Sequence, residues 1–432
     1  MKQLLILIVF GVSLFSCQKE LFNEPEIVTT KNKLLIFRDE DVAVALNTES
    51  GDTLWTSNGV LDRFTPPVYS QGFIFAIGGR SSFVSFLSSI NAENGSNWLS
   101  QQIKVGAYNL FASGNLLISA SNNKVFANDR LTGESVWVYS DVSFNAINRI
   151  ITTIDNQVIV QYNQDILSLD LTSGTLNWRK SAGSEYIQNR ILIHENFAYV
   201  VYGYRNVVEI NLLAGSSRTV FSLPESVNIQ RISIEDNIIY TLSYEESLGT
   251  IEARDVSTGQ SLWRFQNGSF FKSNNNMLLA GDFLVASLGG NVDYSGYLIA
   301  LDKKTGQLKW EKRVDYFFTN YTAYDPKSRI IIFTDYGTSE TPHIYFFNLD
   351  SGDVAFKIPI DYYKSVSPIL ANGEFYYQDA FSKELKKIAL PSGNVQWSYP
   401  IKTSYISPIV VDEDEIQYNG RQLTKTISSG DM

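Results

Sequence analysis

The sequence predicts an all-β fold, a β-propeller of eight or nine four-stranded blades, and three observations lead to this prediction. A turn closed by a glycine, between two apolar segments, recurs nine times along the 432 residues. The spacing of these glycines runs from 38 to 47 residues, which is typical of repeats that each form one propeller blade. All seven tryptophans lie within the repeat. The nine glycines are Gly51, Gly95, Gly133, Gly174, Gly215, Gly259, Gly306, Gly352 and Gly393.

Each turn has the chemistry of a tight hairpin. An acidic or amide residue lies four positions before the glycine in eight copies, as Asp302 does before Gly306. Its side chain accepts hydrogen bonds from the following backbone, and the glycine supplies the positive φ that closes the turn. An aromatic residue follows four positions after the glycine in seven copies; Thr219 replaces it in the fifth, and Trp98 is displaced by one residue in the second. We expect the tryptophans to fill the gaps between adjacent blades.

The segments before a turn supply the rest of a blade. Upstream of Gly306, residues 274–280 and 283–289 form two further strand-like segments separated by a Gly-Asp step. Together with the segments that flank the turn they give four strands per period. Because one hairpin cannot bury its apolar face in water, each blade needs a neighbour on either side.

The two ends of the chain are incomplete in complementary ways. Residues 407–412, after the ninth turn, resemble a first strand without a turn motif of its own. The first copy offers a second, a third and a fourth strand but no first, at 34–38, 42–46 and 53–56. We therefore expect N- and C-terminal strands to pair in one blade and close the ring, which removes open sheet edges. Nine turns favour nine blades; eight would result if the copy with Thr219 or that with Trp98 is not a full blade.

The repeat resembles a known family, the pyrroloquinoline-quinone-like (PQQ-like) propeller repeat, whose pattern is Ala-x-Asp-x-x-Thr-Gly-x-x-x-Trp. Residues 127–137, 253–263 and 300–310 match this pattern, and the resemblance covers nearly all of the chain after residue 33. It implies the propeller fold. It leaves activity open, because the repeat occurs in quinoprotein dehydrogenases and also in non-catalytic scaffolds such as the outer-membrane assembly lipoprotein of the Bam complex, BamB.

Residues 1–16 are expected to be a lipoprotein signal peptide. An apolar run extends over residues 4–15 and is too short to span a bilayer as a helix. The tripeptide 14–16, Leu-Phe-Ser, resembles a lipobox, although Phe15 departs from the small residue usual at its position. The resemblance implies cleavage before Cys17 and lipidation of that cysteine, whose several acyl chains would anchor the protein stably.

Residues 17–32 are expected to be the lipidated cysteine and a tether, and residues 33–432 a single propeller domain. As a flexible coil the tether spans roughly 20 Å. Residues 18–20, Gln-Lys-Glu, resemble the export signal that carries some Bacteroidota lipoproteins to the cell surface. The implied location is the outer membrane of a Gram-negative bacterium, with both its periplasmic side and the cell surface left open.

The composition and charge limit which classes of partner are expected. The formal net charge is −10, and no cluster of Lys and Arg appears, so nucleic acid is not an expected partner. Cys17 is the only cysteine, so the chain forms no internal disulfide and its stability must come from blade packing. We expect a monomer that contacts the membrane through its lipid and binds an envelope protein.

The sequence offers no recognisable catalytic, cofactor-binding or metal-binding residues. The resemblance implies that a dehydrogenase of this family would hold a quinone, a calcium ion, a catalytic aspartate and often a disulfide between adjacent cysteines. A single cysteine cannot form that disulfide, and the turn carboxylates are explained by turn geometry. His194 and His343, the only histidines, lie about 150 residues apart with no partner at the spacing of metal ligands.

Function is therefore expected on the surface. Loops lengthen in the sixth to eighth copies, at 244–249, 289–296 and 335–342, on a face where a rigid scaffold usually carries binding residues. Aromatic residues in neighbouring connections are candidates for a partner surface; the alternative is that they begin the next strand and pack inward. They are Tyr316, Phe317, Phe318, Tyr321, Tyr324, Tyr362 and Tyr363.

Together these observations favour a lipid-anchored, non-enzymatic scaffold that binds a partner protein at the outer membrane, with outer-membrane protein assembly as the specific form of the hypothesis. Two alternatives remain. A quinone-dependent dehydrogenase would require bound cofactor and calcium, and a surface glycan-binding lipoprotein would require exposed aromatic residues and a cell-surface location.

Overall fold

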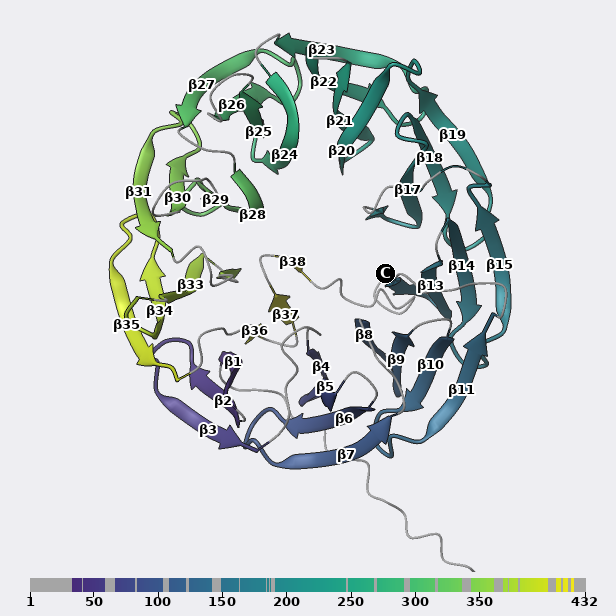
Figure 1. The fold of residues 1–432 in the computed structure, drawn as a ribbon, viewed down its shortest axis with the longest axis vertical. Coiled ribbons are helices and arrows are strands. Elements are labelled where there is room, and N and C mark those ends of the chain that lie inside the picture. Colours follow the sequence, from purple (N-terminus) through teal and green to yellow (C-terminus); the bar gives the residue numbers. More distant parts are fainter. Residues whose placement is uncertain are drawn as a thin grey trace, which may run out of the picture.

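The architecture was analysed in a computed structural model. It describes residues 33–40, 42–58, 67–81, 84–103, 109–121, 124–141, 149–162, 164–183, 185, 187, 191–245, 248–267, 270–290, 296–314, 318–335, 343–360, 368–371, 373–379, 381–402, 409–412, 415–418 and 421–422. The regular elements within these ranges are all β-strands. They form nine sheets arranged in a ring (Figure 1), so the fold is a β-propeller of nine blades and the eight-blade alternative is excluded.

Eight blades each consist of four consecutive antiparallel strands, and we number the blades in chain order. Blade 2 comprises β4 (Val68–Ser70), β5 (Phe73–Ser81), β6 (Val84–Asn91) and β7 (Asn97–Ile103). Blade 3 comprises β8 (Asn109–Ser113), β9 (Leu116–Ser121), β10 (Lys124–Asp129) and β11 (Ser135–Ser140). Blade 4 comprises β12 (Arg149–Ile154), β13 (Gln157–Tyr162), β14 (Asp165–Asp170) and β15 (Leu176–Ser181). Blade 5 comprises β16 (Leu192–His194), β17 (Phe197–Tyr202), β18 (Asn206–Asn211) and β19 (Ser217–Ser222).

The remaining four-strand blades follow the same order from the axis outward. Blade 6 comprises β20 (Val227–Glu235), β21 (Ile238–Glu245), β22 (Leu248–Asp255) and β23 (Ser261–Asn267). Blade 7 comprises β24 (Phe270–Ala280), β25 (Phe283–Gly290), β26 (Gly296–Asp302) and β27 (Leu308–Val314). Blade 8 comprises β28 (Phe318–Asp325), β29 (Ile330–Asp335), β30 (His343–Asn348) and β31 (Val354–Pro359). Blade 9 comprises β32 (Ile369–Ala371), β33 (Glu374–Asp379), β34 (Glu384–Ala389) and β35 (Val395–Pro400).

Blade 1 is completed by strands from both ends of the chain. Its outer strands are β1 (Leu34–Asp39), β2 (Val42–Asn47) and β3 (Thr53–Ser57), and its first strand is β36 (Ile409–Asp412). β36 pairs antiparallel with β1, with Ile36 opposite Ile409 and Leu34 opposite Val411. The expected closure of the ring by the two termini is confirmed. Two further strands, β37 (Glu415–Tyr418) and β38 (Arg421–Gln422), continue this sheet on the inner side of β36.

The two degenerate copies form complete blades. The copy with Trp98 is blade 2 and the copy with Thr219 is blade 5, each with four strands. In blade 2 the register between β6 and β7 pairs Ser89 with Leu99 and Ile90 with Asn97. Trp98 therefore falls at the bulge, and Leu99 takes the strand position that a tryptophan takes in most other blades.

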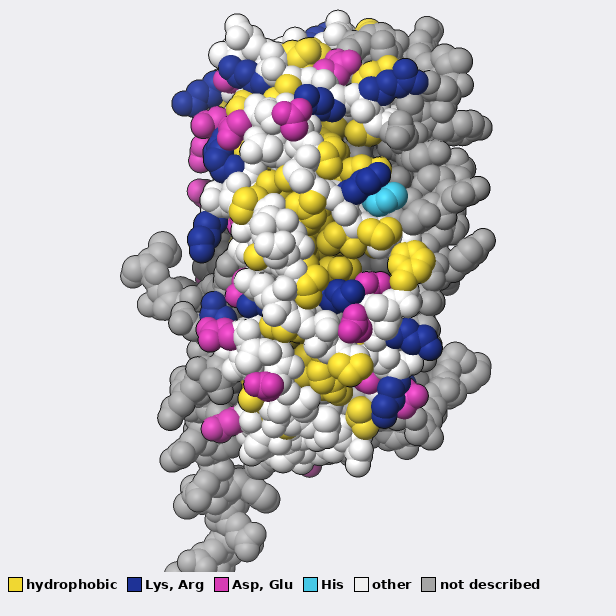
Figure 2. Space-filling view, turned by 90° about the vertical axis from the view of Figure 1, so that its left-hand side faces the viewer, with side chains coloured by type: hydrophobic (Ala, Val, Ile, Leu, Met, Phe, Trp, Pro, Cys, Tyr) yellow, Lys and Arg dark blue, Asp and Glu magenta, His cyan; other side chains and the backbone are white. Residues whose placement is uncertain are grey.

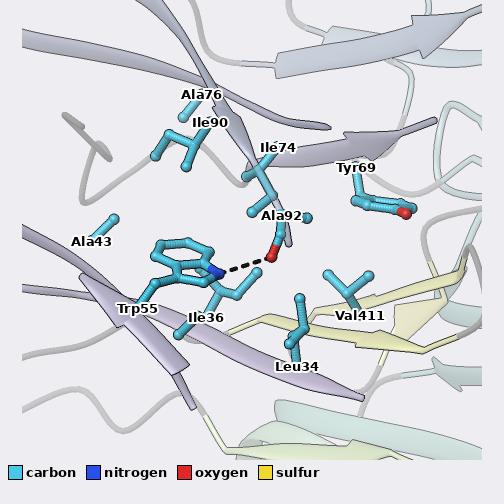
Figure 3. Close-up of a cluster of buried hydrophobic side chains, with 11 residues drawn as sticks. Leu34, Ile36, Ala43, Trp55, Tyr69, Ile74, Ala76, Ile90, Ala92 and Val411 are labelled. Carbon is cyan, nitrogen blue, oxygen red and sulfur yellow. Dashed lines mark hydrogen bonds between the residues drawn. The ribbon is translucent and has the colours of Figure 1, made fainter. Parts of the chain in front are cut away.

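The core is divided among the gaps between blades. Each of nine buried apolar clusters among the described residues combines side chains from two adjacent blades. Figure 3 shows the cluster between blades 1 and 2, where Ile36 and Trp55 meet Ile74 and Ile90, with Val411 of β36 beside them. Because both faces of a blade are covered, the second and third strands are buried almost throughout, as in β14, whereas the outermost strand alternates between exposed and partly buried residues, as in β15.

Candidate functional site

The tryptophans of the repeat join one blade to the next. Each described indole donates a hydrogen bond from Nε1 to the backbone carbonyl three residues before the glycine of the next turn. Trp55 donates to Ala92 at 2.8 Å (Figure 3). The equivalent bonds run from Trp137 to Leu171 (2.8 Å), Trp178 to Leu212 (3.2 Å), Trp263 to Lys303 (2.8 Å), Trp310 to Leu349 (2.7 Å) and Trp397 to Thr48 (2.9 Å). The prediction that tryptophan fills the gaps between blades is confirmed.

The turn that receives the indole is held by its own side chain. In blade 8, Asn348 Oδ1 accepts hydrogen bonds from the backbone N–H groups of Asp350 and Ser351 at 2.9 and 3.1 Å. Gly352 closes this turn with a φ of +70°, and a Cβ there would lie 2.6 Å from Cε3 of Trp310. Glycine is therefore needed both for the backbone conformation and for the close approach of the indole ring.

The junction between blades 5 and 6 is built differently, and sequence reasoning missed it. The bulge in the outer hairpin of blade 5 is shifted, so that Arg218 pairs across the strands with Glu209. This is the pairing position of tryptophan elsewhere, as in the pair of Ala300 and Trp310. Arg218 Nη2 donates to the carbonyl oxygen of Val256 at 2.9 Å, three residues before the turn glycine. An arginine thus makes the hydrogen bond that an indole makes at six other junctions.

The buried carboxylate opposite Arg218 is fully engaged. Arg218 contacts Glu209 through Nε at 2.7 Å and Nη2 at 3.1 Å, and the Tyr199 hydroxyl donates to the same carboxylate at 2.9 Å. Burial, followed by this hydrogen bond to the carboxylate, raises the pKa of the Tyr199 hydroxyl. The available sequence signal was an acidic residue at 209, six before the glycine, together with an arginine at 218.

Further charges lie at the same junction. Glu252 on β22 is buried and accepts hydrogen bonds from Arg254 at 3.0 Å and Arg264 at 3.5 Å. The Arg254 guanidinium carbon lies 4.7 Å from the ring centre of Phe221 on blade 5. Arginine and glutamate side chains therefore add charge to a junction whose apolar cluster includes Val220 and Phe221.

At the junction that closes the ring, between blades 9 and 1, a buried lysine donates a hydrogen bond beside the tryptophan. Lys387, opposite Trp397 on β34, donates to the carbonyl of Thr48 at 2.9 Å, the same carbonyl that accepts from Trp397. Its ammonium group also lies 2.6 Å from Glu374. Two donors from the last four-strand blade thus converge on the first turn of the chain.

The two faces of the ring differ in what they carry. We call the face with the hairpins between first and second strands, and with the repeat's turns, the turn face. We call the opposite face, with the links between second and third strands and between blades, the loop face.

The first strands of blades 6 to 8 are long, with 9, 11 and 8 residues in β20, β24 and β28, whereas β4, β16 and β32 have three each. Blades 6 to 8 therefore form a sector with an extended inner wall.

Two exposed aromatic residues mark the loop face on either side of this sector. Tyr204, in the loop between β17 and β18 of blade 5, is 46% exposed, and Phe381, between β33 and β34 of blade 9, is 62% exposed. Asp379 Oδ1 accepts from the backbone N–H of Phe381 at 3.0 Å, which fixes that loop's backbone. Among the described side chains, these two are the exposed aromatic ones.

The outer wall also exposes aliphatic side chains. Figure 2 shows hydrophobic side chains along the middle of the wall, with charged groups toward its edges. Leu54, Leu308, Val354 and Val395 lie on outermost strands and are 41 to 52% exposed. Single exposed aliphatic residues of this kind are common on protein surfaces and do not by themselves mark a site.

Most of the predicted site residues lie outside the described residues. These are Cys17, Tyr316, Phe317, Tyr362 and Tyr363, together with the expected signal peptide and tether. Phe318 begins β28, but its side chain is not among those described. Tyr324, on the same strand, is partly buried, and this burial raises the pKa of its hydroxyl.

The two histidines occupy different blades. His194 ends β16 in blade 5, and His343 begins β30 in blade 8, with its ring centre 5.6 Å from that of Tyr345. Within the described ranges no three His, Cys, Asp or Glu side chains gather as a set able to hold a metal ion. In the same part of the chain no helix is long and apolar enough to cross a membrane.

A comparison with protein families identifies the family of this propeller. The family described as outer membrane protein assembly factor BamB matches residues 26–139 and 248–409. The chain belongs to this family. The matched segments include β1 to β3 of blade 1, end at the first residue of β36, and leave out blades 4 and 5 and the first two strands of blade 6. A search of curated protein sequences found no significant match.

Solved structures share the fold at low sequence identity. BamB from Moraxella catarrhalis is 16% identical, with a TM-score of 0.48 over 77% of this chain and 94% of that one. The dihydro-heme d1 dehydrogenase NirN is 10% identical, with a TM-score of 0.54 over 84% and 77%. A eukaryotic initiation factor is 12% identical, with a TM-score of 0.53 over 75% and 85%. At such identities the structural likeness supports the fold alone.

Proposed function

We propose that this BamB family member is a lipid-anchored, non-enzymatic scaffold that binds a partner protein at the outer membrane of a Gram-negative bacterium and serves outer-membrane protein assembly. The observation that carries the proposal is the family match, whose description names that process. The tryptophans support the scaffold role, because each described indole has a structural role as a hydrogen-bond donor at a blade junction.

The place where the chain joins the ring fits an anchored scaffold. The carbonyl oxygen of Lys33 accepts from the backbone N–H of Thr48, in the first repeat turn, at 3.2 Å. The chain therefore enters the ring on the turn face. A tether running from a lipidated Cys17 would attach to that face and leave the loop face available to a partner.

We assign the partner surface to the loop face over blades 6 to 8. The first strands of that sector are long, and a rigid scaffold is where binding residues are usually carried. Tyr204 and Phe381 border the sector on blades 5 and 9, and aromatic side chains are common anchors of protein interfaces.

Site-specific photocrosslinking in membranes tests this assignment. A photoreactive residue at position 204 or 381 should crosslink a protein of the outer-membrane assembly machinery, identified by mass spectrometry. The matched control positions are Val136 on the wall, 49% exposed, and Leu213 on the turn face, 37% exposed. Crosslinks to that machinery from the control positions alone would contradict the assignment.

The lipid anchor is tested by Cys17→Ser. The variant should lose incorporation of a radioactive fatty acid and accumulate as an unprocessed or soluble form, because Cys17 is the only cysteine of the chain. Label that persists in the variant would show that the anchor lies elsewhere.

The non-enzymatic part of the proposal has its own test. After addition of pyrroloquinoline quinone and calcium, the purified protein should neither bind quinone stoichiometrically nor oxidise alcohols or sugars with an artificial dye as acceptor. Stoichiometric binding of quinone with turnover would show that the protein is a dehydrogenase and would contradict this part of the proposal.

A further inference from the structure

The closing blade contains more strands than ring closure needs. β36 completes the four strands of blade 1, yet the sheet continues inward through β37 and β38. Val411 pairs with Ile416, and Tyr418 pairs with Arg421. Two residues, 413–414, link β36 to β37, and two more, Asn419 and Gly420, link β37 to β38.

The sequence of the last link encodes a hairpin locally. Asn-Gly is strongly preferred in two-residue hairpin loops, because both central positions of a type I′ turn need positive φ. The sequence of this link therefore favours a tight turn between β37 and β38.

The ring places this hairpin in the central channel. Figure 1 shows β37 and β38 inside the circle of first strands. β37 contacts β4 of blade 2 and β32 of blade 9, the first strands on either side of blade 1. Since neighbouring strands in a sheet lie about 4.8 Å apart, two added strands extend roughly 10 Å from β36 toward the axis.

A wide ring explains why such a segment is needed. Propellers typically have four to eight blades around a central channel, so the nine blades of this ring exceed the usual number. More first strands around one axis make a wider channel, and in blade 1 the inner edge of β36 is covered by β37. An unpaired edge is a template for pairing with another chain.

We propose that residues 415–422 form a plug, separable from the clasp made by β36 and β1, that occupies the central channel and closes it to soluble molecules. The clasp holds the ring together through pairing with β1. Among the described residues the plug's strands pair with the inner edge of β36 and with each other, whereas β36 pairs with β1 on its other edge, so removal of the plug leaves the clasp's own pairing in place.

Two deletions separate the plug from the clasp. Deletion of residues 413–432 removes the plug and keeps β36, whereas deletion of residues 401–432 removes both. We expect the shorter deletion to retain an unfolding midpoint close to that of the full chain and the longer one to lower it substantially. Equal large losses in both would show that the hairpin is part of the clasp, which contradicts the proposal.

A reporter thiol measures access to the channel. In a Cys17→Ser background the chain has no other thiol, so Ser70→Cys on β4, a strand that β37 contacts, is a single reporter. Deletion of residues 413–432 should speed its reaction with a maleimide by about tenfold or more, as expected when a protected site becomes open. Val136→Cys on the outer wall should react at the same rate with and without the plug.

A point substitution provides a second variant with the full chain length. Gly420→Val disfavours the positive φ that an Asn-Gly turn needs and should raise the reactivity of the Ser70→Cys reporter in part, without changing the unfolding midpoint of the ring. Unchanged labelling of that reporter in both the deletion and Gly420→Val would show that the hairpin does not close the channel.

Discussion

Two junctions of the ring solve the same packing problem with different chemistry. Between blades 7 and 8, Trp310 lies on the turn of Asn348 and Gly352 and donates to Leu349 at 2.7 Å. Between blades 5 and 6, Arg218 reaches the equivalent carbonyl of Val256 at 2.9 Å and pairs with the buried Glu209. The contact made by Trp310 is apolar and includes one hydrogen bond. The contact made by Arg218 is an ion pair that includes several hydrogen bonds. The comparison teaches that an indole or a guanidinium can donate to this carbonyl, while between blades 8 and 9 the ring of Phe356, which has no donor, lies against Gly393.

The largest effect is expected from removing the indole. Trp310 is 8% exposed, so Trp310→Ala leaves a cavity between two blades and an unsatisfied carbonyl at Leu349. Truncations of large aromatic residues in cores cost about 3–5 kcal/mol. Chemical denaturation should show a loss of this size. A loss below about 1 kcal/mol would show that the indole covers the junction without stabilising it.

The turn glycine beneath the same indole comes next. Gly352→Ala places a Cβ 2.6 Å from Trp310 at a φ of +70°, so it should cost about 2–4 kcal/mol from backbone strain and displacement of the ring. Gly114→Ala is the matched control, because Gly114 has a φ of +54° and no atom within 4 Å of an added Cβ. The control should lose only about 1–2 kcal/mol in the same measurement. Equal losses would assign the whole effect to φ and none to the indole.

A smaller effect is expected at the polar junction. Arg218 is partly exposed, so Arg218→Ala should cost about 2 kcal/mol, mainly because Glu209 stays buried without its cation. The double variant Glu209→Ala, Arg218→Trp recreates the apolar pattern of the other junctions. Its stability should equal or exceed that of the native protein, since replacing a buried ion pair by well-packed apolar groups is often neutral or favourable. A double variant less stable than Arg218→Ala alone would show that the shifted bulge in blade 5 cannot accept an indole.

The smallest effect concerns pH and again separates the two junctions. Hydrogen bonds from the backbone and the hydroxyl of Thr258 hold the pKa of Asp255 below its ordinary value. Because the folded pKa is the lower one, the stabilisation by Asp255 is present above the unfolded pKa and is lost as the pH falls through the folded pKa. Asp255→Asn should reduce the acid dependence of the unfolding midpoint below about pH 4. Asn348, which holds the turn at the other junction, does not titrate, so Asn348→Ser should leave that dependence unchanged.

Local features of the fold were predictable from the sequence. The turn at Gly352 depends on contacts within five residues, so its amide, its glycine and its spacing could be recognised directly. The pairing of segment 34–38 with segment 407–412, seen between β1 and β36, was also predictable, because the first copy lacked a first strand and the last segment lacked a turn. The candidate site was much less predictable: the aromatic residues at 316–318 and 362–363 remain predictions, and Tyr204 and Phe381 were not proposed.

The sequence by itself determined that this chain forms blades, that tryptophan lies between them and that the termini meet, because each follows from a short motif repeated at a constant period. Tertiary structure decided what no single copy contains. A bulge two residues further along the outer strand put Arg218, and not Thr219, opposite Glu209, and bulge position depends on the partner strand and the neighbouring blade. The place of residues 415–422 was likewise decided by the whole ring, since a channel exists only once nine blades have closed around it.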